Sequence, residues 1–204
     1  MEQADILRVL GPIWVDKAET ARRVRQRLRV ILDWARTAGH RQDVNPVEGV
    51  ERALPKQRDR VKHHAATPWA EVPSIMRRLA DAEGMGALAL RFAILTPARS
   101  GEVRGATRAQ IDTGSAAWPI PAERMKAGRA HRVPLAAPAP AILGQARQLA
   151  ARNDGLIFPS RANGKPLSDM TLSAALKRLE IPVTVHGFRS SFRDWAEERT
   201  TYAR

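Results

Sequence analysis

The chain has 204 residues, 44% of them hydrophobic, which is enough to bury one full core and a smaller second one, and its 34 Lys and Arg against 21 Asp and Glu give a net charge of +13. This surplus is larger than solubility requires, and because the arginines cluster it indicates a nucleic-acid partner, with a merely basic surface as the alternative. The sequence lacks a ~20-residue apolar run, a secretory leader and cysteine, which argues against a membrane span, export, disulfides and thiolate zinc sites, so we expect a bacterial cytoplasmic protein.

The first predicted element is an amphipathic helix over residues 18–38. A ridge of basic side chains that includes Arg22, Arg25 and Arg29 lies beside its apolar stripe. We expect this ridge to contact the phosphates of DNA, with a solvated basic face as the alternative. The apolar stripe itself consists of Ala21, Val24, Leu28, Ile31 and Ala35.

A basic segment without apolar periodicity follows, and it is predicted to be a linker over residues 53–67. His63 and His64 stand next to each other in it. Adjacent side chains point apart on most backbones and no third ligand lies nearby, so we expect no metal there. The linker divides the chain into a first domain over residues 1–52 and a second over residues 68–204.

Helices dominate the second domain. A buried helix carrying Leu88, Phe92 and Leu95 is predicted to end at Pro97, because proline breaks or bends a helix. Phe188, Phe192 and Trp195 recur at helical spacing in the last helix, and we expect all three to lie in the core. One further helix is predicted to begin near Pro73, and two more are predicted over residues 138–151 and 168–179. The last predicted helix covers residues 185–199.

Two short strands are predicted at residues 116–121 and 131–136, because apolar and β-branched residues there flank a turn-like segment. They form a hairpin that places Lys126 in or near its turn. Prolines in both strands keep them short or at a sheet edge. The predicted fold class is therefore α+β, mainly α with a small antiparallel sheet.

Three separated segments carry polar residues that suggest a site: ARSGE at 98–102, RMKAGRAHRVPL at 124–135 and HGFR at 186–189. Each is weak alone. Arg99 and Glu102, for example, are spaced like an ordinary helical ion pair. His186 and Arg189 share one helical face. The order and spacing of the three segments are more specific than any one of them.

Together these segments resemble the catalytic domain of the tyrosine recombinases, also called phage integrases, over residues 68–199. LTPARSGEVRGATRAQID is similar to the family's first arginine segment, HGFR to its His-x-x-Arg box, and ERMKAGRAHRVPL to the hairpin that bears its lysine. Within the family, the sequence of these segments is most similar to that of the P4-type prophage integrases. Residues 1–52 resemble the later part of the helical core-binding domain of those integrases. The resemblance implies the tyrosine-recombinase catalytic fold and double-stranded DNA as partner.

Cutting a DNA strand by attack on a phosphodiester builds negative charge on the non-bridging oxygens. Arg99 and Arg189 are expected to clamp that phosphate, because each guanidinium offers a fixed fork of donors and stays charged. His186 is expected to donate a hydrogen bond or relay a proton. The resemblance implies that Lys126 protonates the departing 5′ oxygen, and Glu102 is expected to orient the donors. We expect neither a metal nor a cofactor.

Family members also carry a second His or Trp after the His-x-x-Arg box, and then a nucleophilic tyrosine on a later helix. By the resemblance Tyr202 falls in the turn before that segment, and on a continued helix it lies about 20 Å from Arg189. We therefore expect no nucleophile in this chain. The expected protein is a monomeric fragment that binds DNA without cutting it, from a parent that acts as a tetramer on DNA.

Other classes of protein stay open at this point. A non-catalytic DNA-binding remnant of an integrase shares every feature above. A type IB topoisomerase shares much of this strand-cleavage chemistry, but the sequence around Lys126 and His186 favours an integrase. A helix-turn-helix regulator accounts for the charge and leaves the three spaced motifs without an explanation.

Overall fold

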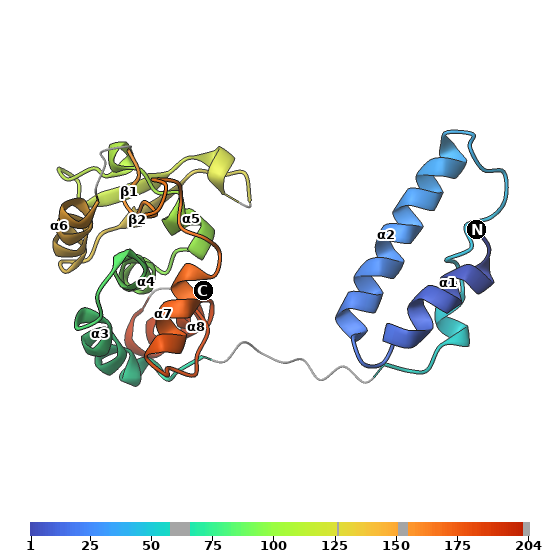
Figure 1. Cartoon of the computed structure of the whole chain (residues 1–204), viewed down its shortest axis with the longest axis horizontal. Coiled ribbons are helices and arrows are strands. Elements are labelled where there is room, and N and C mark those ends of the chain that lie inside the picture. Colours follow the sequence, from blue (N-terminus) through green and yellow to red (C-terminus); the bar gives the residue numbers. More distant parts are fainter. Residues whose placement is uncertain (58–65, 126, 151–154, 202–204) are drawn as a thin grey trace. The chain divides into compact units, whose positions relative to one another are not determined.

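The computed structural model describes residues 1–57, 66–125, 127–150 and 155–201. The chain forms two compact units, Met1–Lys62 and His63–Arg204, and each is described here by itself (Figure 1). Several residues singled out in the sequence lie outside the described residues. They are His63, His64, Lys126 and Tyr202.

Over its described residues, the first unit consists of two α-helices and two short 3₁₀ helices that enclose one small core. Trp14 anchors the segment that leaves the unit, because its indole Nε1 donates a hydrogen bond to the carbonyl of Pro55 at 2.7 Å. Ile6 and Leu10 are fully enclosed in the same core. The elements are α1 (Gln3–Leu10), η1 (Gly11–Ile13), α2 (Ala18–Thr37) and η2 (Val50–Ala53).

The helix predicted over residues 18–38 is confirmed as α2, but one member of its predicted stripe is wrong. Ala21 is buried and Leu28 is half-buried, whereas Ile31 is 59% exposed and Leu32 packs against the core in its place. A helix advances about 100° per residue, so Leu32 stays near the centre of the face defined by Ala21 and Leu28 while Ile31 falls at its edge.

The second unit is mainly helical, as predicted, and its core surrounds one nearly fully buried helix, α4 (Met85–Leu95). The ring of Phe92 lies 5.3 Å from that of Trp118 and 5.4 Å from that of Phe158, measured between centroids. The elements around α4 are η3 (Trp69–Glu71), α3 (Val72–Ala80), α5 (Ser100–Arg104), η4 (Arg108–Gln110), η5 (Ala122–Arg124), α6 (Ala139–Leu149), α7 (Thr171–Arg178) and α8 (Gly187–Arg199).

Close contact between α4 and α7 depends on a glycine. A Cβ atom at Gly86 would lie 2.9 Å from the Thr171 Cγ2 atom, so no larger residue fits without a shift of α7. Helix α4 ends at Leu95 and α5 begins at Ser100, which confirms the predicted break at Pro97. The segment between these two helices therefore changes direction beside the core.

The predicted hairpin is confirmed as a two-stranded antiparallel sheet, β1 (Ala117–Ile120) and β2 (His131–Pro134). Trp118 and Ile120 of β1 are fully buried, and Val133 of β2 is buried with them. This arrangement seats one face of the sheet on the core. The predicted fold class, mainly α with a small antiparallel sheet, is thus confirmed.

The prediction that all three aromatic side chains of the last helix are core residues is wrong for two of them. Phe188 is buried, but Phe192 is 44% exposed and Trp195 is 39% exposed. Phe188, on the first turn of α8, belongs to the hydrophobic core, whereas Phe192 lines an open cavity. The two exposed rings pack against each other instead, with centroids 5.6 Å apart.

Within the described part of the chain, no helix combines the length and apolar composition needed to cross a membrane.

Candidate functional site

Arg99 stands at the N-cap of α5, immediately after the turn that follows α4. The buried carboxylate of Glu102, 7% exposed, holds it at two points. The backbone N–H of Arg99 donates to Oε2 of Glu102 at 2.8 Å, and its Nη1 donates to Oε1 at 2.6 Å. Glu102 therefore caps the helix and fixes the direction of the guanidinium in one arrangement.

Arg189 reaches the same place from the opposite end of the unit's sequence. It lies on the first turn of α8, and its Nη1 donates a hydrogen bond to the backbone carbonyl of Pro97, two residues before Arg99. Burial lowers the pKa of the Arg189 guanidinium, the positive charge of Arg99 lowers it further, and the negative charge of Glu102 raises it. The two arginines and the carboxylate thus form one cluster.

His186 occupies the N-cap position of α8 and is exposed. It lines a cavity of about 990 Å³ together with Arg189, Phe192 and residues of β2. The cavity also includes His131 at the start of β2, for which the sequence pattern predicted only a place in a strand. The position of His131 in the segment RMKAGRAHRVPL, directly after the basic residues of the predicted turn, is the only sequence signal that would have indicated a role in the site.

The structure therefore brings Arg99, Glu102 and Arg189 into contact or close approach, with His186 on the same cavity as Arg189. Lys126, the fifth residue of the predicted site, lies outside the described residues. Among the described residues, no group of three or more His, Asp or Glu side chains is arranged to hold a metal ion. The chemistry that this cluster offers is the binding of an anion by two guanidinium groups.

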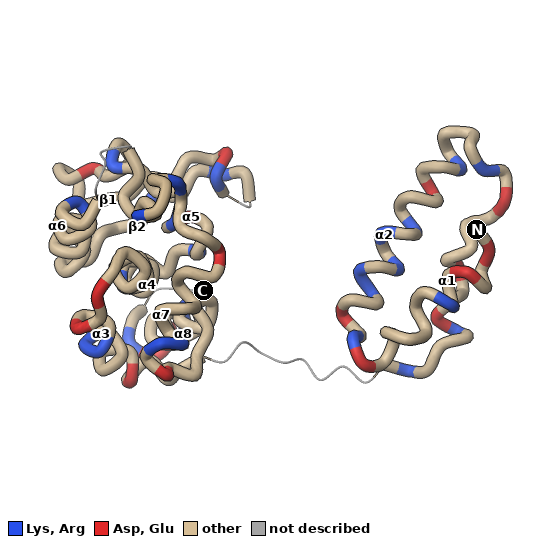
Figure 2. The backbone as a smooth tube through the Cα atoms, viewed as in Figure 1, with Lys and Arg blue, Asp and Glu red and all other residues tan. Residues whose placement is uncertain are grey.

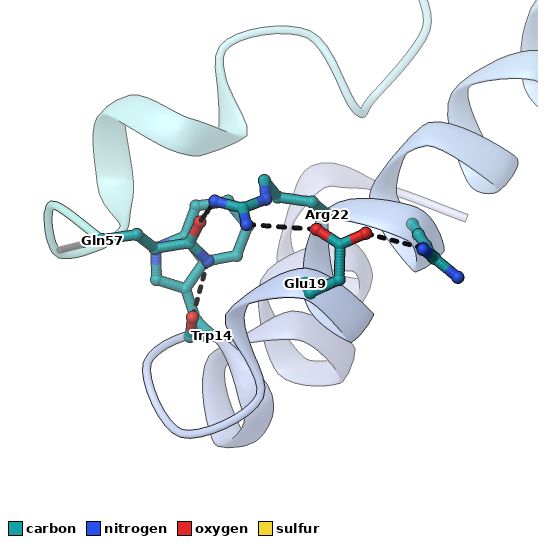
Figure 3. Close-up of polar contacts among 5 residues, drawn as sticks. Trp14, Glu19, Arg22 and Gln57 are labelled. Atoms are coloured by element: carbon teal, nitrogen blue, oxygen red, sulfur yellow. Dashed lines mark hydrogen bonds and ion pairs between the residues drawn. The ribbon is translucent and has the colours of Figure 1, made fainter. Parts of the chain in front are cut away.

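The basic ridge of α2 lies in the other unit, where the blue segments in Figure 2 show arginines spaced along the helix. Arg22 donates from Nη2 to Oε2 of Glu19 at 3.1 Å and from Nη1 to Oε1 of Gln57 at 3.3 Å, and the Gln57 amide donates to the Trp14 carbonyl at 2.6 Å (Figure 3). Arg22 thus ties α2 to the end of the first unit.

The other two members of the ridge also have acidic neighbours. Arg25 forms an ion pair with Glu51 and is about one-third exposed, whereas Arg29 pairs with Asp33 at 3.7 Å and keeps 62% of its side chain exposed. Because Arg29 is the most exposed of the three predicted ridge residues and its ion pair is long, it is the one most available to a phosphate.

The second unit is thus a mainly helical α+β domain in which two arginines distant in the sequence approach each other beside a buried glutamate. Residues 68–198 match the phage integrase family, and residues 1–53 match the phage integrase central domain. The chain therefore belongs to the phage integrase family, the tyrosine recombinases.

Its relatives include integrases of phage and prophage origin. The chain is 31% identical to the integrase of Enterobacteria phage P4 over 196 residues, which cover 87% of this chain and 44% of the phage protein. It is 32% identical to the prophage integrase IntZ of Escherichia coli K12 over 202 residues, which cover 98% of this chain and 49% of the relative. The chain thus spans about half the length of the curated relatives it matches.

Solved structures share the fold at lower sequence identity. A lambda integrase dimer bound to a COC′ core site superposes with a TM-score of 0.71 at 20% identity, covering 98% of this chain and 75% of that chain. The Tn1549 transposon integrase in complex with circular intermediate DNA gives a TM-score of 0.69 at 12% identity, covering 99% and 74%. The predicted tyrosine-recombinase fold is confirmed by these likenesses.

Proposed function

We propose that this chain is the DNA-binding, phosphate-clamping part of a site-specific DNA recombinase whose full-length form cuts and rejoins DNA through a 3′-phosphotyrosine. The observation that carries the proposal is the convergence of Arg99 and Arg189. One is held by Glu102 and the other by the carbonyl of Pro97, so both guanidinium groups are in place before any ligand arrives. Preorganised donors of this kind stabilise charge that develops on a phosphate during strand cleavage.

The remaining roles follow the chemistry of that reaction. His186, on the same cavity as Arg189, would donate a hydrogen bond to the phosphate or relay the proton of the attacking hydroxyl. Lys126 would protonate the departing 5′ oxygen, a role that family membership supports. Glu102 would act on Arg99 alone, because both of its carboxylate oxygens are taken up by that residue.

We propose in addition that this chain binds DNA without cutting it. Helix α8 continues to Arg199, ten residues beyond Arg189, which carries the chain about 15 Å away from the clamp at 1.5 Å per residue. Tyr202 follows that end in the sequence and lies outside the described residues. The chain then has no nucleophile of its own, and a non-catalytic DNA-binding remnant of an integrase is the alternative form of the same proposal.

The proposed partner is double-stranded DNA at an attachment site. Similar proteins include a lambda integrase tetramer bound to a Holliday junction. For this chain we propose a monomer in solution and a tetramer on DNA for the full-length protein. We propose that Arg22, Arg25 and Arg29 contact the DNA backbone from the first unit. A cytoplasmic location is part of the same proposal.

The test is DNA binding by the full chain, with duplexes selected from a random library. Arg189→Ala is expected to weaken binding and to reduce the slope of log K against log salt by about 1, because one phosphate contact is lost. Arg77→Ala is the matched control, since it removes the same charge from an exposed position on α3. Equal effects of the two substitutions would refute the clamp.

A suicide duplex, nicked so that a short fragment diffuses away after cleavage, tests the second proposal. The expected result is bound DNA with no covalent product after denaturation. A protein–DNA adduct that survives denaturation, and that Tyr202→Phe abolishes, would show that this chain carries its own nucleophile.

A further inference from the structure

Arg124 joins the connection between the two strands to the helix that carries Arg99. It lies at the end of η5, and its Nη2 donates to the backbone carbonyl of Glu102 at 2.8 Å. Its Nη1 donates to Oε1 of Gln110 at 3.0 Å. The guanidinium of Arg124, which lies on η5, therefore bridges two acceptors, one on α5 and one on η4.

The space for this guanidinium depends on Gly105, at the C-terminal end of α5. A Cβ atom there would lie 2.5 Å from Nη2 of Arg124 and 3.2 Å from its Cζ. The φ angle of Gly105 is −98°, which any residue adopts, so the backbone conformation does not require glycine. The glycine is needed because the Arg124 guanidinium lies directly over it.

Gln110 is the second anchor of the same arrangement. Its Oε1 also accepts hydrogen bonds from the backbone N–H of Thr107 at 3.1 Å and, at 3.4 Å, from the indole Nε1 of Trp118, which is fully buried in β1. The side chain that receives Arg124 is thus fixed by η4 and by the sheet. Arg124 is tied to a rigid part of the core.

We propose that Arg124 is a positioning residue for the phosphate clamp. By holding the Glu102 carbonyl it fixes the backbone of α5, and through the Glu102 carboxylate it fixes the guanidinium of Arg99. The proposal rests on the proposed function, because the clamp is the site that Arg124 serves.

The choice of acceptors supports a positioning role. Arg124 forms no ion pair with any carboxylate that the structure describes, and it binds Glu102 only through the main-chain oxygen. Both carboxylate oxygens of Glu102 therefore remain with Arg99. A cation that paired with the carboxylate would compete with Arg99, whereas a donor to the carbonyl supports the same residue without competing.

The arrangement also explains why the position holds arginine. A guanidinium presents several donors in a fixed planar fork and can satisfy two acceptors on different elements at once. A lysine ammonium is a compact point charge on a flexible stem and would hold the two acceptors with less geometric constraint. The order of Arg99 should therefore fall in the series from arginine to lysine to glutamine at position 124.

The experiment uses the full chain labelled with ¹⁵N and follows the side-chain signals of Arg99 and Arg189, with inorganic phosphate as the probe. A locked guanidinium gives resolved, slowly exchanging Nη signals. In Arg124→Gln we expect those of Arg99 to broaden while those of Arg189 persist. We expect phosphate binding to weaken roughly fivefold, the effect of losing about one net hydrogen bond. Arg124→Lys should restore part of both.

Gly105→Ala supplies a variant that keeps the charge. Its methyl group should displace the Arg124 guanidinium and loosen Arg99 as Arg124→Gln does, and adding it to Arg124→Gln should cause little further change, because the two act through one contact. The control is Arg129→Ala, an exposed arginine of the same connection. In the Arg129→Ala variant, the side-chain NMR signals of Arg99 should match those of the unsubstituted chain.

Two results would overturn the proposal. One is that Arg99 stays ordered in Arg124→Gln. The other is that Arg99 and Arg189 loosen together while the melting temperature falls, which would show a general structural role. Because the order of Arg99 is read without DNA, a chain that fails to bind DNA at all would refute the proposed function and leave this measurement intact.

Discussion

The indole Nε1 of Trp69 donates a hydrogen bond to Oε2 of Glu198 at 2.8 Å, although 129 residues separate the two in sequence. The Arg199 guanidinium lies over the same ring, 4.8 Å from its centroid. Ser191 adds a third contact, since its hydroxyl donates to the Thr67 carbonyl at 2.5 Å. The segment that enters the second unit is thereby fastened along α8, the helix that carries Arg189.

Replacing Trp69 tests this attachment. Trp69→Phe keeps a ring for the cation–π contact and loses the hydrogen bond, so we expect the free energy of unfolding to fall by about 0.5–1.5 kcal/mol. Trp69→Ala removes both contacts and should cost more. Urea unfolding followed by circular dichroism measures the difference. Identical stability of all three proteins would contradict an energetic role for the Trp69 contacts.

Glu102→Gln tests the support of Arg99. The glutamine keeps the shape but presents an NH₂ group to one of the two donors of Arg99, which removes one of the two hydrogen bonds that the Glu102 carboxylate accepts from Arg99. We expect a loss of about 1–3 kcal/mol in unfolding free energy, together with weaker DNA binding. Glu123→Gln, an exposed glutamate in the same unit, serves as control. A Glu102→Gln protein with unchanged stability and affinity would remove Glu102 from the site.

The exposed position of Arg29 on α2 leads to a prediction for the first unit. Arg29→Ala should reduce the salt slope of DNA binding by about 1 without lowering the melting temperature appreciably, because its ion pair with Asp33 is exposed and long. Arg8→Ala removes a charge from α1 that is also exposed, 80% against 62% for Arg29, and is the control. If both substitutions change the slope equally, α2 does not contact the phosphates.

The stability of the first unit should depend on pH through Glu19. Hydrogen bonds from Arg22 and then Arg23 hold the pKa of this carboxyl below its ordinary value. The folded state therefore gains stability from ionised Glu19 above the ordinary glutamate pKa of about 4.3, and that gain is lost as the pH falls through the lowered folded value. Urea unfolding from pH 7 to pH 2, followed by the NMR signals of α2, measures it. Glu19→Gln should flatten this part of the profile, and an unchanged profile would exclude the effect.

Helical periodicity and proline placement predicted most of the fold. The break at Pro97 and the hairpin were recovered because these signals are local. Ile31 and Phe192 were misplaced for a different reason. Periodicity identifies a face of a helix, but how much of that face is covered depends on what packs against it, and this information lies in other parts of the chain.

The candidate site was likewise predictable from the sequence only in part. The pairing of Arg99 with Glu102 is visible in a spacing of three residues, whereas the approach of Arg189 depends on the carbonyl of Pro97, 92 residues away. Only the resemblance to the tyrosine recombinases predicted that Arg99 and Arg189 act in one site. Arg124 and Gly105 escaped notice altogether, because a guanidinium over a glycine leaves no periodic pattern in a sequence.

The position of Arg189 has one more consequence. Its charge is held half-buried beside Arg99, so burial and the repulsion between the two cations lower the pKa of its guanidinium, while Glu102 offsets part of this. An anion placed between the two guanidinium groups removes that repulsion and binds only the folded state, which links ligand binding to folding. The proposed phosphate binding would therefore also stabilise the second unit against unfolding.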